Sequence, residues 1–485
     1  MIRTYLLEHR AEFIEQLKCL VRFPSVSAQP AHRPDILDCA DWLAQHFRSI
    51  GMDVKLCPTD GNPILVARAG VACAVPSASR AGVARAVPSA SRAGAPHVVV
   101  YGHYDVQPPE PLDLWNTPPF EPVVRGGKLF GRGASDNKGQ FFAHVKAVEA
   151  CLKTGTPLPV NLTFLIEGEE EVGSESLMKF VKNHSRELRA DYVIVSDSSM
   201  FARGLPTLTY ATRGTVAVEV RIDGPSRDLH SGVFGGSVAN PAVVLSRLLA
   251  SCVNGDGRIT IPGFYDGVMP VAAWERRMWR CLPFDPEGYR RFLGAPALAG
   301  EKGFTTLERR WARPTFEING LTSGYQGPGG KTIVPAWASA KISCRTVPNQ
   351  DPARVSRAVE RHLRRQCPKS VRLTIATGSN PWFFAPPNGP GAKAALAALE
   401  KAFGGKPVCA REGGTLPILE DFRRYLRGEI ILVGLGLPDD NWHSPNEKMD
   451  LGNFHRGIVM SMELLRELGA SAERDCASTT KSASV

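Results

Sequence analysis

Four short apolar runs, each followed directly by a polar segment, place the strongest constraint on how this chain can fold. Residues 97–101 (HVVVY) lead into GHYDVQP, 160–166 (VNLTFLI) into EGEEEVGS, 191–195 (DYVIV) into SDSS, and 429–433 (EIILV) into GLGLPDDNWHSPNEK. A helical spacing of apolar residues over 138–153 lies between the first two runs. Strands that alternate with helices predict an α/β fold built on a mostly parallel sheet.

A second set of elements begins near Arg213 and interrupts the first. It comprises strand-like and helical segments in the order β-α-β-α-β, at residues 215–223, 238–252, 337–345, 353–366 and 370–376. We therefore expect a discontinuous larger domain, residues 1–211 and 379–470, and an inserted α+β domain, residues 212–378. The length of 485 residues also favours two or three domains over a single core.

Three segments fall outside these predicted elements. Residues 69–94 contain AGVACAVPSASR followed at once by AGVARAVPSASR, a tandem duplication. Two copies are too few for a repeat fold, so we interpret this low-complexity stretch as a surface insertion. Residues 471–485 are expected to be a disordered tail. Residues 253–336, rich in Pro, Gly and Trp, show no pattern that assigns elements.

Composition limits the possible functions. The net charge of +10 comes mainly from scattered arginines, and the densest patches, 361–365 and 423–427, fit solvated helix faces better than a nucleic-acid interface. The sequence contains no run of 18 apolar residues, which is the length that a membrane-spanning helix needs. The eleven cysteines form no CxxC pair, which favours reduced thiols in a cytoplasmic protein and argues against a thiolate zinc site. The N-terminal residues resemble an amphipathic helix and not a signal peptide.

Imidazole and carboxylate groups follow the predicted strands. The candidates are His103, Asp136, Glu171, Asp197 and His443. Taken singly, each has an ordinary explanation as a surface residue, a helix cap or a turn residue. Ligands of α/β sheets bind beyond the carboxyl ends of the strands, so these side chains could converge. This ligand chemistry suits Zn²⁺ or Mn²⁺ and not a metal that prefers thiolates.

Two further acids fit supporting roles at such a site. Glu170 could take a proton from water whose pKa the metals lower, and pass it to the leaving amine. Asp105, two residues after His103, could accept the N–H of that imidazole. The run Glu169 to Glu171 leaves the register of base and ligand open by one position. We place the base at Glu170 and the ligand at Glu171 because the pair should directly precede the x-Gly-Ser turn.

The motifs GHYDVQP, GRGASDNKG, EGEEEVGS, SDSS, RDLHSGVFGGSV, REGGTLP and NWHSPNEK occur in that order. With them, residues 10 to about 465 resemble the dinuclear zinc metallopeptidase family of carnosinases, acetylornithine deacetylases, succinyl-diaminopimelate desuccinylases and carboxypeptidase G. RDLHSGVFGGSV and the KTIVP…CRTVPNQ stretch bring the sequence nearest to the cytosolic dipeptidase branch. The duplicated insertion 69–94 matches nothing in the family.

The resemblance implies a fold, a cofactor and a set of ligands. The fold would be a parallel-sheet catalytic domain interrupted by a ferredoxin-like domain that serves as lid and dimerisation domain. His103, Asp136, Glu171, Asp197 and His443 would hold two divalent metal ions per subunit, with Asp136 as the bridge. Zn²⁺ is the expected metal, with Mn²⁺ or Co²⁺ as alternatives. Asp105 would orient His103, and Glu170 would be the general base.

The resemblance also implies substrate contacts from the inserted domain. His230 would polarise the scissile carbonyl, and in the family it often reaches into the site of the partner subunit. Arg345, with Thr332 and Thr415, would hold the terminal carboxylate of the substrate. A histidine can supply the donor that an oxyanion needs, and a guanidinium grips a carboxylate with two prongs. Without the resemblance, His230 would be interpreted as a loop residue and Arg345 as a surface arginine.

The predicted function is a cytoplasmic, metal-dependent dipeptidase that hydrolyses small peptides with a hydroxide bridging two metal ions. A homodimer through the inserted domain is expected, without nucleic-acid or membrane partners. N-acyl-amino-acid deacylase or carboxypeptidase activity at the same site is the alternative within enzymes. A non-catalytic peptide-binding protein is the alternative of another class, but every expected ligand and base position is occupied.

Overall fold

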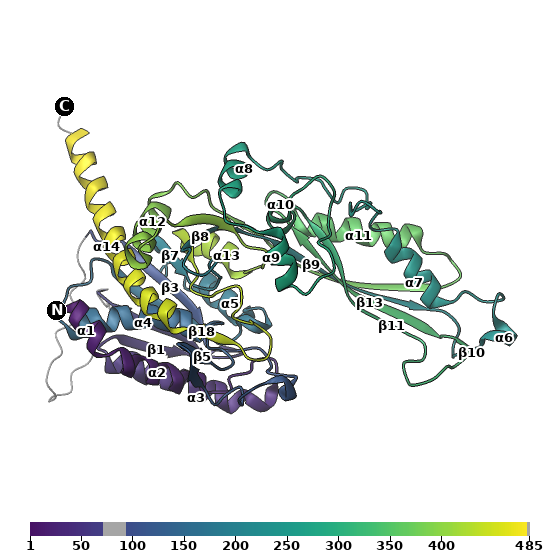
Figure 1. The fold of residues 1–485 in the computed structure, drawn as a ribbon, viewed down its shortest axis with the longest axis horizontal. Helices are drawn as coiled ribbons and strands as arrows, with labels where there is room; N and C mark the ends of the chain where they lie inside the picture. The colour runs from purple at the N-terminus through teal and green to yellow at the C-terminus, as the bar shows by residue number, and fades with distance from the viewer. Residues whose placement is uncertain (71–93, 483–485) are drawn as a thin grey trace. The chain divides into compact units, whose positions relative to one another are not determined.

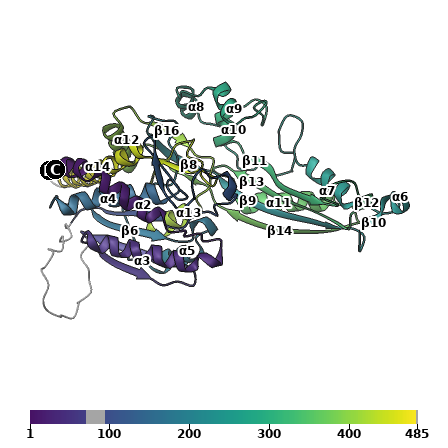
Figure 2. The same cartoon turned by 60° about the horizontal axis from the view of Figure 1, so that its bottom comes forward.

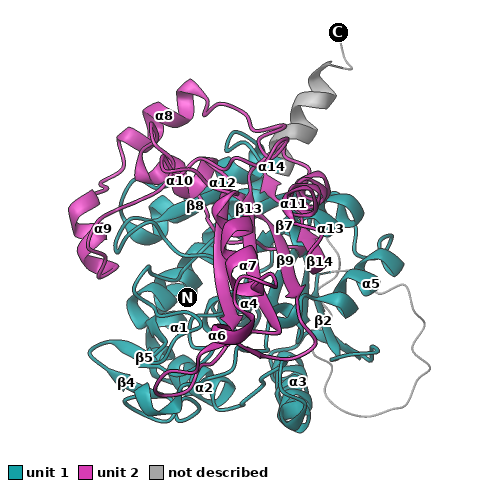
Figure 3. Ribbon diagram, turned by 90° about the vertical axis from the view of Figure 1, so that its right-hand side faces the viewer, with its two compact units in different colours: residues 1–210, 385–410, 418–485 teal, residues 211–384, 411–417 magenta. Residues whose placement is uncertain are grey.

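The structure, a computed structural model of the whole chain, describes residues 1–70 and 94–482, and side chains up to residue 471. Most of the predicted insertion 69–94 therefore lies outside the described residues. The chain forms two compact units (Figure 3). Unit 1 comprises residues 1–210, 385–410 and 418–485, and unit 2 comprises residues 211–384 and 411–417.

A mixed sheet forms the centre of unit 1. Its strand order is β1 (Asp53–Cys57), β2 (Ile64–Ala69), β6 (Asn161–Glu167), β3 (His97–His103), β7 (Tyr192–Val195), β17 (Glu429–Val433) and β8 (Thr207–Thr212), with β16 (Val408–Arg411) beside β8. The strands β6, β3, β7 and β17 run parallel, and β1, β2 and β8 join antiparallel at the flanks. The four parallel strands are the four apolar runs of the sequence, so the predicted mostly parallel sheet is confirmed.

Six helices cover one face of this sheet. They are α1 (Ile2–Glu8), α2 (Arg10–Val21), α3 (Arg33–Ser49), α4 (Lys138–Lys153), α12 (Pro390–Phe403) and α14 (Leu451–Ser482). Alternate strand residues such as Val98, Val100 and Ile194 enter the core beneath them, where Phe47 packs on Phe164 with ring centroids 5.1 Å apart. Figures 1 and 2 show α4 and α14 lying side by side.

The opposite face of the sheet carries α5 (Glu175–Asn183), α13 (Ile418–Asp421) and a π-helical turn (Phe422–Leu426). Here Tyr101 of β3 meets Phe422 with ring centroids 5.2 Å apart. Short 3₁₀ turns occur at Pro30–His32, Leu112–Leu114 and Glu170–Val172, and a small sheet is formed by β4 (Val123–Arg125), β5 (Lys128–Phe130) and β18 (Lys448–Asp450). Both sheet faces are thus buried, as a parallel sheet requires.

Unit 2 is built on a four-stranded antiparallel sheet. Its order is β11 (Thr315–Ser323), β13 (Trp337–Thr346), β9 (Gly214–Asp223) and β14 (Arg372–Asn380). Helices α7 (Pro241–Ala250) and α11 (Pro352–Gln366) pack on one face, and Figure 2 shows α11 along β9 and β14. The chain order β9-α7-β11-β13-α11-β14 is ferredoxin-like, as the resemblance implied.

Further short elements complete unit 2. The strands β10 (Leu229–His230) and β12 (Ile333–Val334) pair with each other, and α6 (Ser231–Phe234) follows β10. β15 (Phe383–Phe384) pairs with residues 211–212 at the end of β8. Helices α8 (Ala273–Arg280), α9 (Pro286–Phe292) and α10 (Thr306–Ala312), together with β11, occupy the stretch 253–336 that the sequence left unassigned.

The structure differs from the expected organisation at three places. The inserted domain was expected at residues 212–378, whereas the main segment of unit 2 comprises residues 211–384. The separate segment 411–417 also belongs to unit 2. Helix α14 continues to Ser482, over most of the tail 471–485 for which disorder is expected.

Within the described residues, no helix is long and apolar enough to cross a membrane.

Candidate metal centre

The carboxyl ends of the parallel strands carry the predicted ligands of unit 1. His103 ends β3, Glu171 lies in the 3₁₀ turn after β6, and Asp197 follows β7. His443 lies in the loop after β17, and Asp136 lies in the loop before α4, preceding a cis peptide bond. Parallel strands end at one edge of a sheet, so residues that are far apart in sequence meet there.

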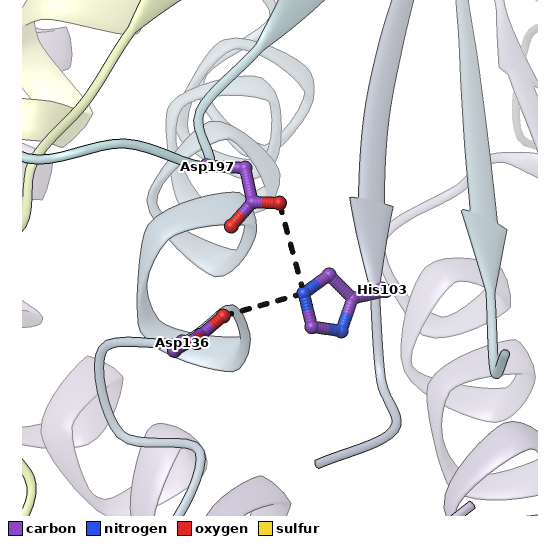
Figure 4. Close-up of side chains that lie close together, drawn as sticks. All are labelled: His103, Asp136 and Asp197. Atoms are coloured by element: carbon purple, nitrogen blue, oxygen red, sulfur yellow. Dashed lines mark ion pairs between the residues drawn. The ribbon is translucent and has the colours of Figure 1, made fainter. Parts of the chain in front are cut away.

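Two groups among these five side chains have the composition and spacing of a metal site. His103, Asp136 and Asp197 form the first, and Asp136, Glu171 and His443 form the second; within each group the candidate ligand atoms lie within 4.8 Å of one another. Figure 4 shows the first group, with the imidazole of His103 facing both carboxylates. Asp136 belongs to both groups, which is the arrangement that a bridging carboxylate needs.

The two oxygens of Asp136 serve different groups. His103 Nε2 lies 3.4 Å from Asp136 Oδ1 and 3.8 Å from Asp197 Oδ2. On the other side, His443 Nε2 lies 2.9 Å from Asp136 Oδ2 and 3.5 Å from Glu171 Oε2. Three carboxylates and two imidazoles therefore surround two adjacent positions, each with nitrogen and oxygen donors, a set that suits Zn²⁺ or Mn²⁺.

The imidazole of His103 tests whether a cation fits. Its Nδ1 lies 3.0 Å from the backbone oxygen of Asp105 and 3.3 Å from Oδ1 of the same residue. A proton on Nδ1 satisfies these acceptors, which leaves the Nε2 lone pair directed at carboxylate oxygens. That Nε2 is buried and has no hydrogen-bond partner. A metal ion at this position would satisfy both the nitrogen and the carboxylates, so the residues fit the expected group.

The pKa shifts at the site show a shortage of positive charge. Burial, reinforced by Asp136, raises the pKa of Glu171 to about 10, and burial with Asp197 and Asp136 raises that of Glu170 well above its usual range. Burial alone would lower the pKa of His103, but the carboxylates of Asp105, Asp136 and Asp197 beside its ring raise it well above 6.5. These groups therefore favour their protonated forms, because the carboxylates lack cations to balance them. Bound divalent ions would lower the three pKa values again.

Asp105 and Glu170 lie beside the candidate ligands. Asp105 is fully buried, and besides His103 its carboxylate accepts the backbone N–H groups of Glu170 and Glu171 at 3.2 and 3.1 Å. Glu170 Oε2 lies 3.9 Å from His103 Nε2, whereas Glu171 is the glutamate grouped with His443.

Several supporting residues were not singled out from the sequence. Gln107 Nε2 donates to Glu171 Oε2 at 2.8 Å, and Asn137 Nδ2 donates to Asp197 Oδ1 at 2.9 Å. Glu447 accepts hydrogen bonds from the loop that carries Asp136. Gln107 and Glu447 lie inside the motifs GHYDVQP and NWHSPNEK, so motif membership was the available signal.

The candidate substrate residues of unit 2 form two clusters. Arg345 Nη1 donates to the hydroxyl oxygens of Thr215 and Thr415 at 2.8 and 2.7 Å. His230 lies at the paired strands β10 and β12, next to Thr332, whose backbone oxygen accepts the N–H of Ser231 at 3.0 Å. His230 is exposed, and its Nδ1 accepts the N–H of Gly232.

The fold and the site together define a metallopeptidase scaffold with a discontinuous catalytic unit. Residues 99–467 match the model of peptidase family M20/M25/M40. The chain belongs to this family.

Relatives and solved structures extend this result over nearly the whole chain. The Cys-Gly metallodipeptidase dug1 of Schizosaccharomyces pombe is 33% identical over 95% of this chain and 96% of its own length. The Beta-Ala-His dipeptidase of Homo sapiens is 32% identical over 96% and 91%. The structure of the dipeptidase Dug1p from Saccharomyces cerevisiae matches with a TM-score of 0.83 at 29% identity, covering 97% of this chain and 98% of that one. Human carnosine dipeptidase 1 matches with a TM-score of 0.82 at 30% identity, covering 97% and 98%.

Proposed function

We propose that this protein is a dipeptidase that hydrolyses the amide bond of small peptides with two divalent metal ions, Zn²⁺ by preference. The observation that carries the proposal is the pair of ligand groups that share Asp136. Bound metal ions would lower the pKa of water at the site and polarise the scissile carbonyl. The rest of the chemistry belongs to the side chains.

Glu170 is proposed as the general base. Its carboxylate takes a proton from the attacking water and later gives it to the nitrogen of the leaving amine. Asp105 holds the backbone N–H groups of Glu170 and Glu171 and the Nδ1 side of His103, so one buried carboxylate positions the base and two ligands. His230 donates to the carbonyl oxygen as it becomes negative.

Arg345 and its hydroxyl neighbours are proposed to bind the carboxylate of the substrate. The guanidinium is half-buried and is held between Thr215 and Thr415, and it has no carboxylate partner within 4.0 Å among the described residues. An arginine placed in this way is available for a ligand carboxylate. Thr332, beside His230, is proposed as a further contact. A free carboxylate on the substrate suits a dipeptide, and the relatives above include Cys-Gly and Beta-Ala-His dipeptidases.

An N-acyl-amino-acid deacylase or a carboxypeptidase would use the same site. The purified protein, loaded in turn with Zn²⁺, Mn²⁺ and Co²⁺, should be assayed against Cys-Gly, β-Ala-His and other dipeptides, and against matched N-acetyl and N-succinyl amino acids and longer peptides. We expect dipeptides to give the highest kcat/KM. Turnover of acylated amino acids alone would replace the dipeptidase assignment by a deacylase.

We also propose a homodimer formed through unit 2. The loop around His230 exposes the apolar side chains of Val233, Phe234 and Val238 to solvent. Apolar side chains that are exposed together are typical of a surface that contacts another protein. Sedimentation equilibrium at micromolar concentration should give twice the chain mass. Charged substitutions at Val233 and Phe234 should give monomers, and a wild-type protein that stays monomeric would rule out this assembly.

A further inference from the structure

Glu447 ties together two of the three segments that supply the second ligand group, the Asp136 loop and the His443 loop. Its carboxylate is fully buried. Oε2 accepts hydrogen bonds from Arg132 Nη1 at 2.8 Å and from the backbone N–H of Gly133 at 2.9 Å. Oε1 accepts from the backbone N–H groups of Ser135 and Asp136 at 2.9 and 3.0 Å. One side chain thus fixes the backbone of the residue shared by both ligand groups.

A second set of contacts joins the same loops. Ser135 Oγ donates to Asp440 Oδ2 at 3.0 Å and accepts from Trp442 Nε1 at 2.9 Å. Lys448 Nζ donates to the other oxygen of Asp440 at 2.7 Å. Asp440 and Trp442 lie three residues and one residue before His443, and Glu447 follows it four residues later. Both flanks of the His443 loop are therefore anchored to the Asp136 loop.

The His443 loop needs such an anchor because its backbone is strained. Asn441, His443 and Asn446 have φ values of 58°, 58° and 61°, in the left-handed region that residues other than glycine rarely adopt. Such a backbone conformation persists only when neighbouring contacts enforce it. The two members that only the first ligand group has differ in this respect, because His103 ends β3 and Asp197 lies two residues after the end of β7.

We propose that Glu447 is a positioning residue that sets the affinity of the second ligand group, Asp136, Glu171 and His443, for its metal ion. The proposal rests on the metal site of the proposed function. It explains why a buried glutamate, and not an apolar residue, occupies a position with four convergent N–H donors. Outer partners of ligands typically change metal affinity by roughly 10- to 100-fold.

Glu447→Gln tests the proposal because it keeps the size of the side chain and replaces one acceptor oxygen by a donor. The bound metal of dialysed protein should be counted by mass spectrometry while free Zn²⁺ is buffered over several decades. We expect wild type to bind two ions. In the variant the second ion should bind at least ~10-fold more weakly, and excess Zn²⁺ should restore kcat. Glu447→Asp should give a smaller loss.

Glu149→Gln is the matched control. Glu149 is a buried glutamate of unit 1 that accepts from Lys146 Nζ at 2.6 Å, and it contacts none of the candidate ligands. This variant should lose stability and still bind both ions with unchanged affinity. Unchanged binding of both ions by Glu447→Gln would overturn the proposal, as would an equal weakening of both ions. A wild type that binds no metal would overturn the proposed function itself.

Arg213 carries an independent inference within unit 2. Its backbone N–H and its Nε donate to the carbonyl oxygens of Gly414 and Gly413, each at 3.0 Å, while Arg345 donates to Thr415 in the same loop. Nη1 of Arg213 is buried without a hydrogen-bond partner. Burial and the nearby charge of Arg345 lower the pKa of Arg213 to about 10. Two guanidiniums and the Thr415 hydroxyl thus converge on one loop, and an unmatched donor is left over.

We infer that Arg213 is a second carboxylate-binding arginine, which shares the terminal carboxylate of the substrate with Arg345. A buried donor without a partner is unfavourable, and a carboxylate would satisfy it. The inference deepens the proposed function by making a free carboxylate, and not merely a peptide bond, a requirement for binding.

Arg213→Met should be compared with wild type on a dipeptide, and inhibition by the product amino acid should be compared with inhibition by its amide. We expect KM for the dipeptide to rise at least ~10-fold with little change in kcat, and the preference for acid over amide inhibitor to fall by a similar factor. Arg213→Lys should recover part of both losses. An unchanged acid-to-amide preference in the Met variant would overturn the inference. A wild type that cleaves no dipeptide would count against the proposed function instead.

Discussion

Single side chains set the electrostatics of the candidate site. The pKa of Asp136 is held well below its usual value because the nearby imidazoles of His103 and His443 outweigh its burial, while the pKa values of Glu170 and Glu171 shift in the opposite direction. Asp136 and Glu171 are proposed ligands, and Glu170 is left as the base. Its high pKa without metal should fall once the ions balance the neighbouring carboxylates.

Glu170→Gln separates metal binding from proton transfer. The amide cannot accept the proton of water, so kcat should fall by roughly 10²- to 10⁴-fold. Both metal ions should stay bound, because Glu170 belongs to neither ligand group. Steady-state kinetics and metal analysis on the same preparation make the comparison. Turnover within a few-fold of wild type would remove Glu170 from the role of base.

Among helices and strands, the apolar pattern of the sequence predicted those elements whose side chains are mostly buried. The four parallel strands and helix α4, Lys138–Lys153, follow the predicted runs closely because both faces of that sheet are covered. Strand β11 was missed because all of its residues are half-buried or exposed, so no alternation of buried and exposed positions marks it. The loop 411–417 is separated from the rest of unit 2 in sequence, and only tertiary contacts assign it there.

Gly139 shows how tightly α4 fits the Asp136 loop. Gly→Ala inside a helix ordinarily stabilises by up to about 1 kcal/mol. Here a Cβ would lie 2.0 Å from the backbone oxygen of Ala134, so Gly139→Ala should instead destabilise by about 1–3 kcal/mol. Urea unfolding measures the change. Gly405→Ala, where a Cβ would meet nothing within 4 Å, is the control and should stay within about 0.5 kcal/mol.

At the scale of the whole molecule, the sequence predicted the candidate ligands better than their support. His103, Asp136, Glu171, Asp197 and His443 could be found because they follow strand ends in recognisable motifs. The partners Gln107, Asn137 and Glu447 act through hydrogen bonds to residues up to several hundred positions away, and no local pattern encodes such pairs. The roles of Arg345 and His230 came from the resemblance alone.

Global stability should fall in mild acid, partly through His144. This fully buried imidazole lies 2.7 and 2.8 Å from the hydroxyl oxygens of Ser196 and Ser461, and burial lowers its pKa to about 4. In the unfolded chain the same imidazole has a pKa of about 6.5, so the unfolded state binds the proton first as pH falls. His144 therefore causes no loss of stability above pH ~6.5, and it lowers the free energy of unfolding by about 3 kcal/mol near pH ~4.

The measurement is the free energy of unfolding of metal-free protein in urea at pH values from 7.5 to 4.5, for wild type and His144→Asn. The variant should be less stable at neutral pH and should lose less stability on acidification. Parallel curves for the two proteins would contradict the assignment of this pH dependence to His144.

Five side chains from distant parts of unit 1 are proposed to hold two metal ions around Asp136. The most direct measurement is the number of Zn²⁺ ions bound per chain at buffered free metal, for wild type, His443→Ala and Asp136→Ala. We expect two ions for wild type, one for His443→Ala, and a severe loss of both for Asp136→Ala. Wild-type protein that binds no ion, or two ions that persist in Asp136→Ala, would contradict this proposal.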